Sequence, residues 1–254
     1  MNRNLGVAAG LGLLVMTAFT GPAHAVCPPQ DPCSGCPILI EFDANCFAYE
    51  TSYTKATFTS DPGSQLSVVG LVVSFGVPLN FLTPNCPTTE YTFVMTGLTS
   101  AGTVVTVNGP TTNYDTDYAG GTFAVYEGSP CDAPATAADW AANPYGGAVV
   151  PATFQNGTAI LTGVLCGFHV NVNKTVVGPT TIIGGSYQSN YNFDGGTQFG
   201  RVGEGVSLVH GVWCPDLPGC TPANYTAHAN GKFDSSHTTL ATPSTWGRLK
   251  LIYR

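Results

Sequence analysis

Nine cysteines are the residues of this chain with the widest choice of chemistry. Thiols at such spacings form disulfide bonds, bind zinc, or carry out redox exchange. Cys33 and Cys36 form a C-x-x-C pair, but strand-like sequence follows them instead of the βαβ pattern of a thioredoxin-like redox site. The nine residues are Cys27, Cys33, Cys36, Cys46, Cys86, Cys131, Cys166, Cys214 and Cys220.

The first 25 residues help to choose among these chemistries. Arg3 precedes an uncharged, largely apolar run at residues 5–20, and Ala23-His24-Ala25 offers the small residues of a cleavage site. This order is typical of a secretory signal peptide, so we expect residues 1–25 to be removed on export. Exported proteins meet an oxidising compartment, where cysteines pair.

All nine cysteines are therefore candidates for structural disulfide bonds. A zinc site that joins the two close pairs, Cys33 with Cys36 and Cys214 with Cys220, is the alternative. Nine is an odd number, so at least one thiol stays reduced or bonds another chain.

Asn113, Asp115 and Asp117 stand at alternate positions in the segment NYDTDYAGG. Oxygen ligands with this spacing begin a calcium-binding loop. The later residues of such a loop are missing, because Tyr118 stands where the invariant glycine belongs and no glutamate closes the loop. We expect no cofactor; calcium is the leading candidate among small ions, and an Asx-rich turn with solvated carboxylates is the alternative.

Two histidines, His169 and His210, lie inside the strand-like runs GFHVNV and SLVHGVW. Histidines on different strands can converge on a metal ion across a sheet, with a carboxylate as a further ligand. The sequence lacks an H-x-H pair on one strand, so histidines with structural hydrogen bonds are the alternative.

Carboxylates are the remaining candidates for chemistry. A glycosidase needs two carboxyl groups that face each other across a cleft. No G-x-S-x-G, H-E-x-x-H or dinucleotide-binding motif occurs, so we assign no catalytic residue. The strand-associated acids are Glu41, Asp43, Glu127, Glu204 and Asp234.

The charge balance excludes one class of partner. The chain has 8 basic and 15 acidic residues, and none of the basic ones lies between Lys55 and Lys174. Nucleic-acid backbones require clustered cations, so we expect no nucleic-acid binding. The acidity also disfavours anionic membrane surfaces, and no later segment is long and apolar enough to span a bilayer, so we expect no membrane insertion after cleavage.

The elements that must position these residues are strands. Only 9% of residues are charged, and 31 glycines and 19 prolines supply turns. Strand-like segments recur along the chain, and three turn signals separate pairs of them: Asn156-Gly157, Asp194-Gly195-Gly196 and Asn230-Gly231. The strand-like segments are Ile38–Phe42, Cys46–Phe58, Gln65–Phe75, Tyr91–Met95, Thr103–Val107, Thr122–Tyr126, Val149–Phe154, Thr158–Val164, Ser186–Phe193, Thr197–Val202, Val206–Trp213, Asn224–Ala229 and Lys232–Ser236.

We therefore predict an all-β fold, a mostly antiparallel β-sandwich or a jelly-roll-like barrel, and a closed barrel fits the same series of strands. It forms a single β domain at residues 26–243, with a disulfide-rich N-terminal head at residues 26–46. Residues 135–142 are the one internal helix that we expect. The tail at residues 244–254 forms a short helix or strand and carries three basic residues, Arg248, Lys250 and Arg254.

The segment Gly121–Gly163 and the tail STWGRLKLIYR resemble features of uncharacterised exported bacterial β-rich proteins. This resemblance implies an envelope or extracellular role and transfers no catalytic residue. We expect a non-enzymatic structural or binding module, at the bacterial cell surface, in the extracellular space or in the periplasm. Its expected partner is a cell-surface glycan or a protein. A secreted glycoside hydrolase on a jelly-roll scaffold and a metal-binding β protein are the alternatives.

Overall fold

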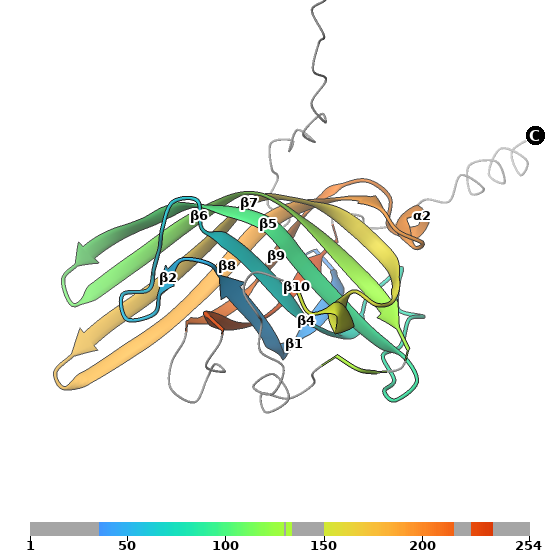
Figure 1. Ribbon diagram of the computed structural model, residues 1–254, viewed down its shortest axis with the longest axis horizontal. Helices are drawn as coiled ribbons and strands as arrows, with labels where there is room; N and C mark the ends of the chain where they lie inside the picture. The colour runs from blue at the N-terminus through green and yellow to red at the C-terminus, as the bar shows by residue number, and fades with distance from the viewer. Residues whose placement is uncertain (1–35, 130, 134–149, 216–224, 236–254) are drawn as a thin grey trace, which may run out of the picture.

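The computed structural model describes residues 36–129, 131–133, 150–215 and 225–235. Within them, eight strands form one closed antiparallel barrel (Figure 1), in which each strand pairs with its neighbours along the chain and the last strand closes on the first. The barrel strands are β1 (Ile38–Glu50), β4 (Gln65–Phe75), β5 (Glu90–Asn108), β6 (Thr111–Gly128), β7 (Thr158–Val177), β8 (Thr180–Gly195), β9 (Val206–Pro215) and β10 (Ala227–Asp234).

Four short elements complete the described structure. β2 (Tyr53–Thr54) and β3 (Thr59–Ser60) pair with each other between β1 and β4. A 3₁₀ turn, η1 (Ala152–Phe154), precedes β7, and the helical turn α2 (Phe199–Val202) follows β8. Neither of these described helical segments is long and apolar enough to cross a membrane.

The structure confirms the all-β, mostly antiparallel fold and has the closed barrel among the three architectures that fit the sequence. The hydrogen-bonded sheet closes on itself, so there are not the two facing sheets of a sandwich. The strands also follow one another round the barrel, whereas a jelly roll has Greek-key connections. Inward and outward side chains alternate along the strands of a sandwich, a jelly roll and a closed up-and-down barrel alike. The sequence pattern therefore did not distinguish these three architectures.

The three predicted hairpin turns are wrong. Asn230-Gly231 lies inside β10, Asn156-Gly157 joins η1 to β7, and Asp194-Gly195-Gly196 leads from β8 towards α2. The two-residue hairpin loops are Gly109-Pro110 and Gly178-Pro179, and both glycines have a φ of 59°. Glycine suits this first loop position because the tight hairpin turn requires a positive φ there.

Aromatic rings fill the interior of the barrel. The ring centroid of Phe123 lies 5.4, 5.6 and 5.2 Å from those of Tyr191, Phe193 and Phe233. Further along the interior, Phe168 stacks on Tyr187, and Trp213 packs edge-on against Tyr187. Eight strands enclose a space that side chains can just fill, so this interior is a packed core.

Two glycines allow the rings to approach the wall closely. Gly211 of β9 and Gly231 of β10 are direct register partners. A Cβ atom on Gly231 would lie 2.2 Å from the hydroxyl oxygen of Tyr187 and 2.9 Å from the Phe42 ring. The inner side of this part of the wall is therefore bare backbone, against which Tyr187 and Phe42 pack.

The described cysteines agree in part with the disulfide prediction. Cys86 and Cys131 form a disulfide bond with each other. Cys36 and Cys166 each take part in a disulfide bond as well. Cys46 is buried in β1, at the end of the segment predicted as a disulfide-rich head, and Cys214 is partly exposed on β9. Residues 1–35, the expected helix at 135–142, the tail at 244–254 and the thiols Cys27, Cys33 and Cys220 lie outside the described residues.

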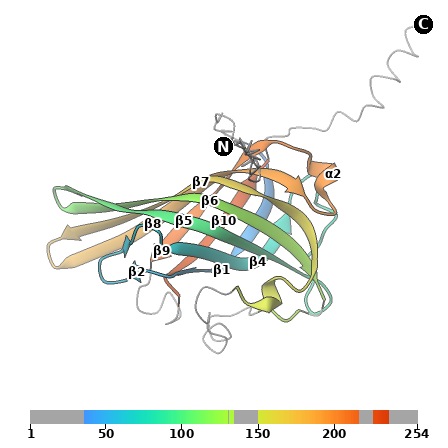
Figure 2. The same ribbon diagram turned by 45° about the horizontal axis from the view of Figure 1, so that its top comes forward.

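Two long hairpins extend beyond the barrel (Figures 1 and 2). The pairing of β4 with β5 ends at Thr99, and the pairing of β8 with β9 begins at Ser186. Beyond these points β5, β6, β7 and β8 continue as a four-stranded sheet, which we call the projecting sheet (residues 104–115 and 172–185).

Candidate functional site

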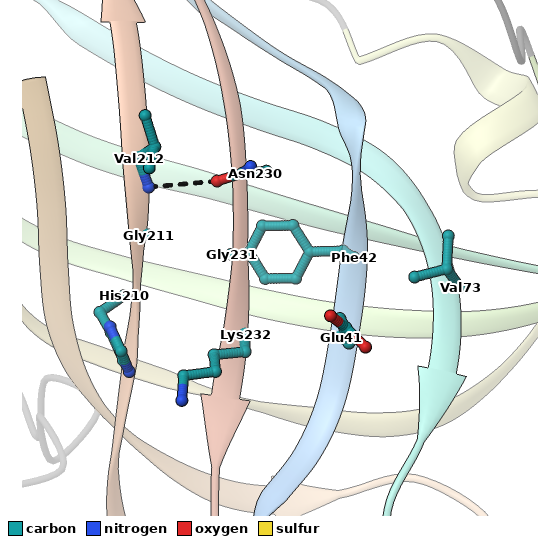
Figure 3. Close-up of a pocket in the computed structure, with 9 residues that line it drawn as sticks. All are labelled: Glu41, Phe42, Val73, His210, Gly211, Val212, Asn230, Gly231 and Lys232. Carbon is teal, nitrogen blue, oxygen red and sulfur yellow. Dashed lines mark hydrogen bonds between the residues drawn. The ribbon is translucent and has the colours of Figure 1, made fainter. Parts of the chain in front are cut away.

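A pocket of about 400 Å³ opens on the outer wall of the barrel, where β9, β10 and β1 lie side by side (Figure 3). Its volume is at the lower end of the range for small-molecule sites. The residues that line it are Glu41, Phe42, Val73, His210, Gly211, Val212, Asn230, Gly231 and Lys232.

Sheet register brings the charged residues of this pocket together. Lys232 is the partner of His210 on one side and of Glu41 on the other. Directly opposed residues of antiparallel strands project from the same face of a sheet. The three side chains therefore form one row across the mouth of the pocket (Figure 3).

An irregularity in β1 shapes one side of the pocket. Phe42 and Cys46 are opposite Gly231 and Ala229 of β10, so β1 contains two extra residues in this interval. The same shift appears against β4, where Phe42 and Phe47 are opposite Val72 and Val69. Such bulges bend a strand locally and are frequent beside functional sites.

Asp234 contacts two side chains of the row, His210 and Lys232. Its side chain is buried, and its carboxylate oxygens lie 3.0 Å from His210 Nε2 and 3.4 Å from Lys232 Nζ. Its backbone carbonyl accepts hydrogen bonds from Ser207 Oγ and, at 2.5 Å, from the hydroxyl of Tyr191. Burial raises the pKa of Tyr191 far above its usual value, so this phenol stays a donor. Hydrogen bonds from core residues thus fix the position of Asp234, which contacts both His210 and Lys232.

Glu41 adds a carboxylate, a hydrogen-bond acceptor, to the pocket. Its side chain is exposed and accepts a hydrogen bond of 3.0 Å from Ser74 Oγ. Lys232 separates it from His210 in the row. The pocket therefore presents the Lys232 ammonium and the His210 imidazole on one side and a carboxylate acceptor on the other, with Val73 and Val212 as apolar margins.

The contacts of His210 do not suit nucleophilic catalysis. Within the described residues, its polar contact is with Asp234. No described serine, threonine or cysteine stands where a catalytic histidine would activate it.

The carboxyl groups with raised pKa lie away from the pocket. Burial raises the pKa of Glu50, which accepts hydrogen bonds from Ser60 Oγ and, at 3.0 Å, from the hydroxyl of Tyr118. Burial also raises the pKa of Glu90, which accepts a hydrogen bond of 3.1 Å from the backbone N–H of Asp132. Both groups have structural donors and no part in the pocket.

The structure brings together only two of the described glycosidase candidates. Glu41 lines the pocket, and Asp234 is ion-paired beside it. Glu127 is opposite Tyr91 near one end of β6, and Glu204 follows α2. Asp43 lies outside the described side chains.

The calcium candidates Asn113, Asp115 and Asp117 lie on β6, so the expected turn is wrong. Asp117 Oδ1 lies 2.8 Å from His169 Nδ1, and Asp115 Oδ1 accepts a hydrogen bond of 2.6 Å from Asn171. Calcium binding stays a prediction, and these carboxylates already contact protein donors from β7.

His169 and His210 share one face of the barrel, but Gln188 of β8 stands between them in the register. They belong to a circumferential row on seven strands, which we call the polar belt: Asp117, His169, Gln188, His210, Lys232, Glu41 and Ser74. The one group of three metal-ligating atoms within 4.8 Å among the described residues joins Glu90 to Cys86 and Cys131, whose sulfurs are bonded to each other.

Sequence reasoning missed Lys232 and Asn230 as parts of the site. The alternation of small and polar residues in AHANGKFD was the available signal, but the Asn230-Gly231 turn motif obscured it.

No protein-family model, curated protein or solved structure matches this chain.

Proposed function

We propose that this protein is an exported, non-enzymatic barrel that binds a carboxylate-bearing sugar of a surface glycan in the pocket of Glu41, His210 and Lys232. The observation that supports this most strongly is the contrast between the two sides of the barrel wall. Aromatic rings occupy the inside, whereas the outside carries a small pocket with the Lys232 ammonium, the His210 imidazole and the Glu41 carboxylate. A ligand site therefore lies on the wall, not within it.

The chemistry of the pocket favours a sugar acid. Lys232 offers a positive charge to a carboxylate, Glu41 can accept hydrogen bonds from ring hydroxyls, and Asn230 can donate or accept them. A volume of about 400 Å³ suits one or two sugar units better than a folded partner.

The polar belt supports function in water. A barrel that spans a bilayer presents an apolar band to the lipid. Here the outward row contains acids, histidines, a glutamine and a lysine, and inward positions carry the rings. We infer that the mature chain is not inserted in a membrane.

The disulfide bond between Cys86 and Cys131, together with the bonded Cys36 and Cys166, supports an exported location. The cell surface, the extracellular space and the periplasm all satisfy this condition.

The glycosidase alternative has weaker support. A hydrolase of this kind pairs an ionised carboxylate with a carboxyl group of raised pKa across a cleft. Glu50 and Glu90, the described carboxyl groups with raised pKa, lie outside the pocket, and Asp234 is engaged by His210 and Lys232.

Calorimetric titration of the mature protein with short uronate oligomers and with neutral oligomers of the same length tests the proposal. We expect Lys232→Met to weaken uronate binding by about tenfold or more, because a charge-assisted hydrogen bond contributes roughly 1.5–3 kcal/mol. Lys174→Met, which removes the same charge from β7, should leave the affinity unchanged. No uronate binding, equal binding of neutral oligomers, or an equal loss in both variants would reject the assignment.

A further inference from the structure

The projecting sheet has two edges, formed by β5 and β8. Residues 104–108 of β5 pair with β6 on one side, and no described strand pairs with their other side. Residues 180–185 of β8 form the opposite edge in the same way. Each edge therefore presents backbone groups that can receive a further strand.

The hairpin loop determines which backbone groups of the β5 edge point outward. Asn108 and Thr111 close the two-residue loop, and the closing pair of such a hairpin exchanges hydrogen bonds. Alternate residues of β5 then bond to β6, and the residues between them point away from it. Val105 and Val107 therefore direct their N–H and C=O groups to the edge.

The β5 edge is unusually well suited to strand pairing. Residues 103–107 are all β-branched, and none is charged. Val104, Val105 and Val107 are 66%, 48% and 71% exposed. Proteins usually protect such edges with lysine, proline or a covering segment. The β8 edge differs, because Gly184 and Gly185 interrupt its β-branched run.

We propose that the β5 edge docks the β5 edge of a second copy of this chain, antiparallel about a two-fold axis at Thr106. In this register Val105 of each copy exchanges hydrogen bonds with Val107 of the other, and Thr106 lies opposite itself. Pairing then produces one continuous sheet of eight strands, with a barrel at each end. A self-complementary edge of this kind forms a closed two-fold contact.

Charge distribution favours a second copy as the occupant. The whole chain has a net charge of −7, yet residues 101–114 and 175–185 contain no charged residue. The ends of the two projecting sheets, at residues 101–114 and 175–185, therefore approach without like-charge repulsion. The antiparallel arrangement keeps the acidic barrels far apart. Added salt should screen the remaining repulsion and strengthen the dimer.

Sedimentation equilibrium of the mature protein tests the contact. We expect a monomer–dimer equilibrium that Val105→Lys/Val107→Lys shifts to monomer by at least tenfold in the dissociation constant. The matched variant Thr181→Lys/Ile183→Lys places the same charges on the β8 edge and should leave the dimer unchanged. Near-ultraviolet circular dichroism confirms that both variants keep the aromatic core. A wild-type monomer at millimolar concentration, or a dimer that only the β8 variant breaks, would overturn the proposal.

A cysteine pair tests the register. Directly opposed residues of a non-hydrogen-bonded pair have Cα atoms about 4.5 Å apart, which a disulfide can bridge. Thr106→Cys should therefore form a covalent dimer on mild oxidation. Val104→Cys lies on the same face, two residues away, and should not cross-link to its own copy. Equal cross-linking of both variants would reject the two-fold register.

Discussion

The two faces of β10 show how one strand serves two purposes. On its inner face, Gly231 and Phe233 fit the aromatic core and leave no free space beside Tyr187 and Phe42. On its outer face, Asn230 and Lys232 line an open pocket, and Asp234 contacts Lys232 and His210. Stability is concentrated on the inner face and the proposed ligand binding on the outer face, so substitutions one residue apart should have different consequences.

Phe233→Ala should have the largest effect on stability. The ring is fully buried and lies within 6 Å of Phe42, Phe123 and Tyr191. Removal of such a side chain leaves a cavity and costs about 3–5 kcal/mol. Chemical denaturation should show this loss, whereas a loss below about 1 kcal/mol would mean that the interior is not packed as described.

Gly231→Ala should have the second largest effect. The added methyl group would meet the Tyr187 hydroxyl at 2.2 Å and the backbone oxygen of His210 at 2.4 Å, so strand and ring must move apart. Overpacking of this kind costs about 1–3 kcal/mol. Gly109→Ala serves as a control, because its Cβ atom would meet nothing within 4 Å. Gly109→Ala changes the backbone strain of the hairpin loop but places no new atom against the core.

Glu50→Gln should change how stability depends on pH. Burial raises the pKa of Glu50 in the folded protein above its usual value, so folding favours the protonated form. The contribution of Glu50 to folding stability is therefore fully present below the pKa that it has in the unfolded chain. It is lost as the pH rises through the higher pKa that it has in the folded protein. Denaturation at several pH values from 4 to 7 should show that the variant gains stability relative to wild type as the pH rises. A constant difference across this range would contradict the prediction.

Lys232→Met should have the smallest effect on stability. Its ammonium group is partly exposed, and His210 still contacts Asp234 when it is removed. The free energy of unfolding should change by no more than about 1 kcal/mol, as expected for a partly solvated ion pair. Thermal denaturation of the samples prepared for the uronate titration provides this measurement. A loss as large as that of Phe233→Ala would remove the distinction between the two faces.

The sequence predicted those parts of the fold that local alternation determines. Gln65–Phe75 was predicted with the bounds that β4 has, and His210, Glu41 and Asp234 were recognised one by one as candidates. Their convergence depends on sheet register, which a single strand does not reveal. Tyr91–Met95 and Thr103–Val107 were predicted as separate strands but are parts of β5, where Gly97 and Gly102 take positive φ values within the strand.

Asn230-Gly231 shows the limit of local motifs most clearly. The dipeptide favours a hairpin turn when only its neighbours in the chain are considered. In the structure, glycine is required at position 231 because the Tyr187 hydroxyl occupies the space of a side chain. That requirement comes from a residue on another strand, so no local pattern contains it.

The pocket takes Glu41 from the first barrel strand and Lys232 from the last, and these two strands meet where the barrel closes. A ligand that bridges them can bind only after the whole cylinder has assembled. It would then hold the closing seam together, so occupancy should protect the amide protons of β1 and β10 from exchange more than those of any other strand pair. Binding of the ligand proposed for this pocket would thus occur only in molecules whose barrel has closed.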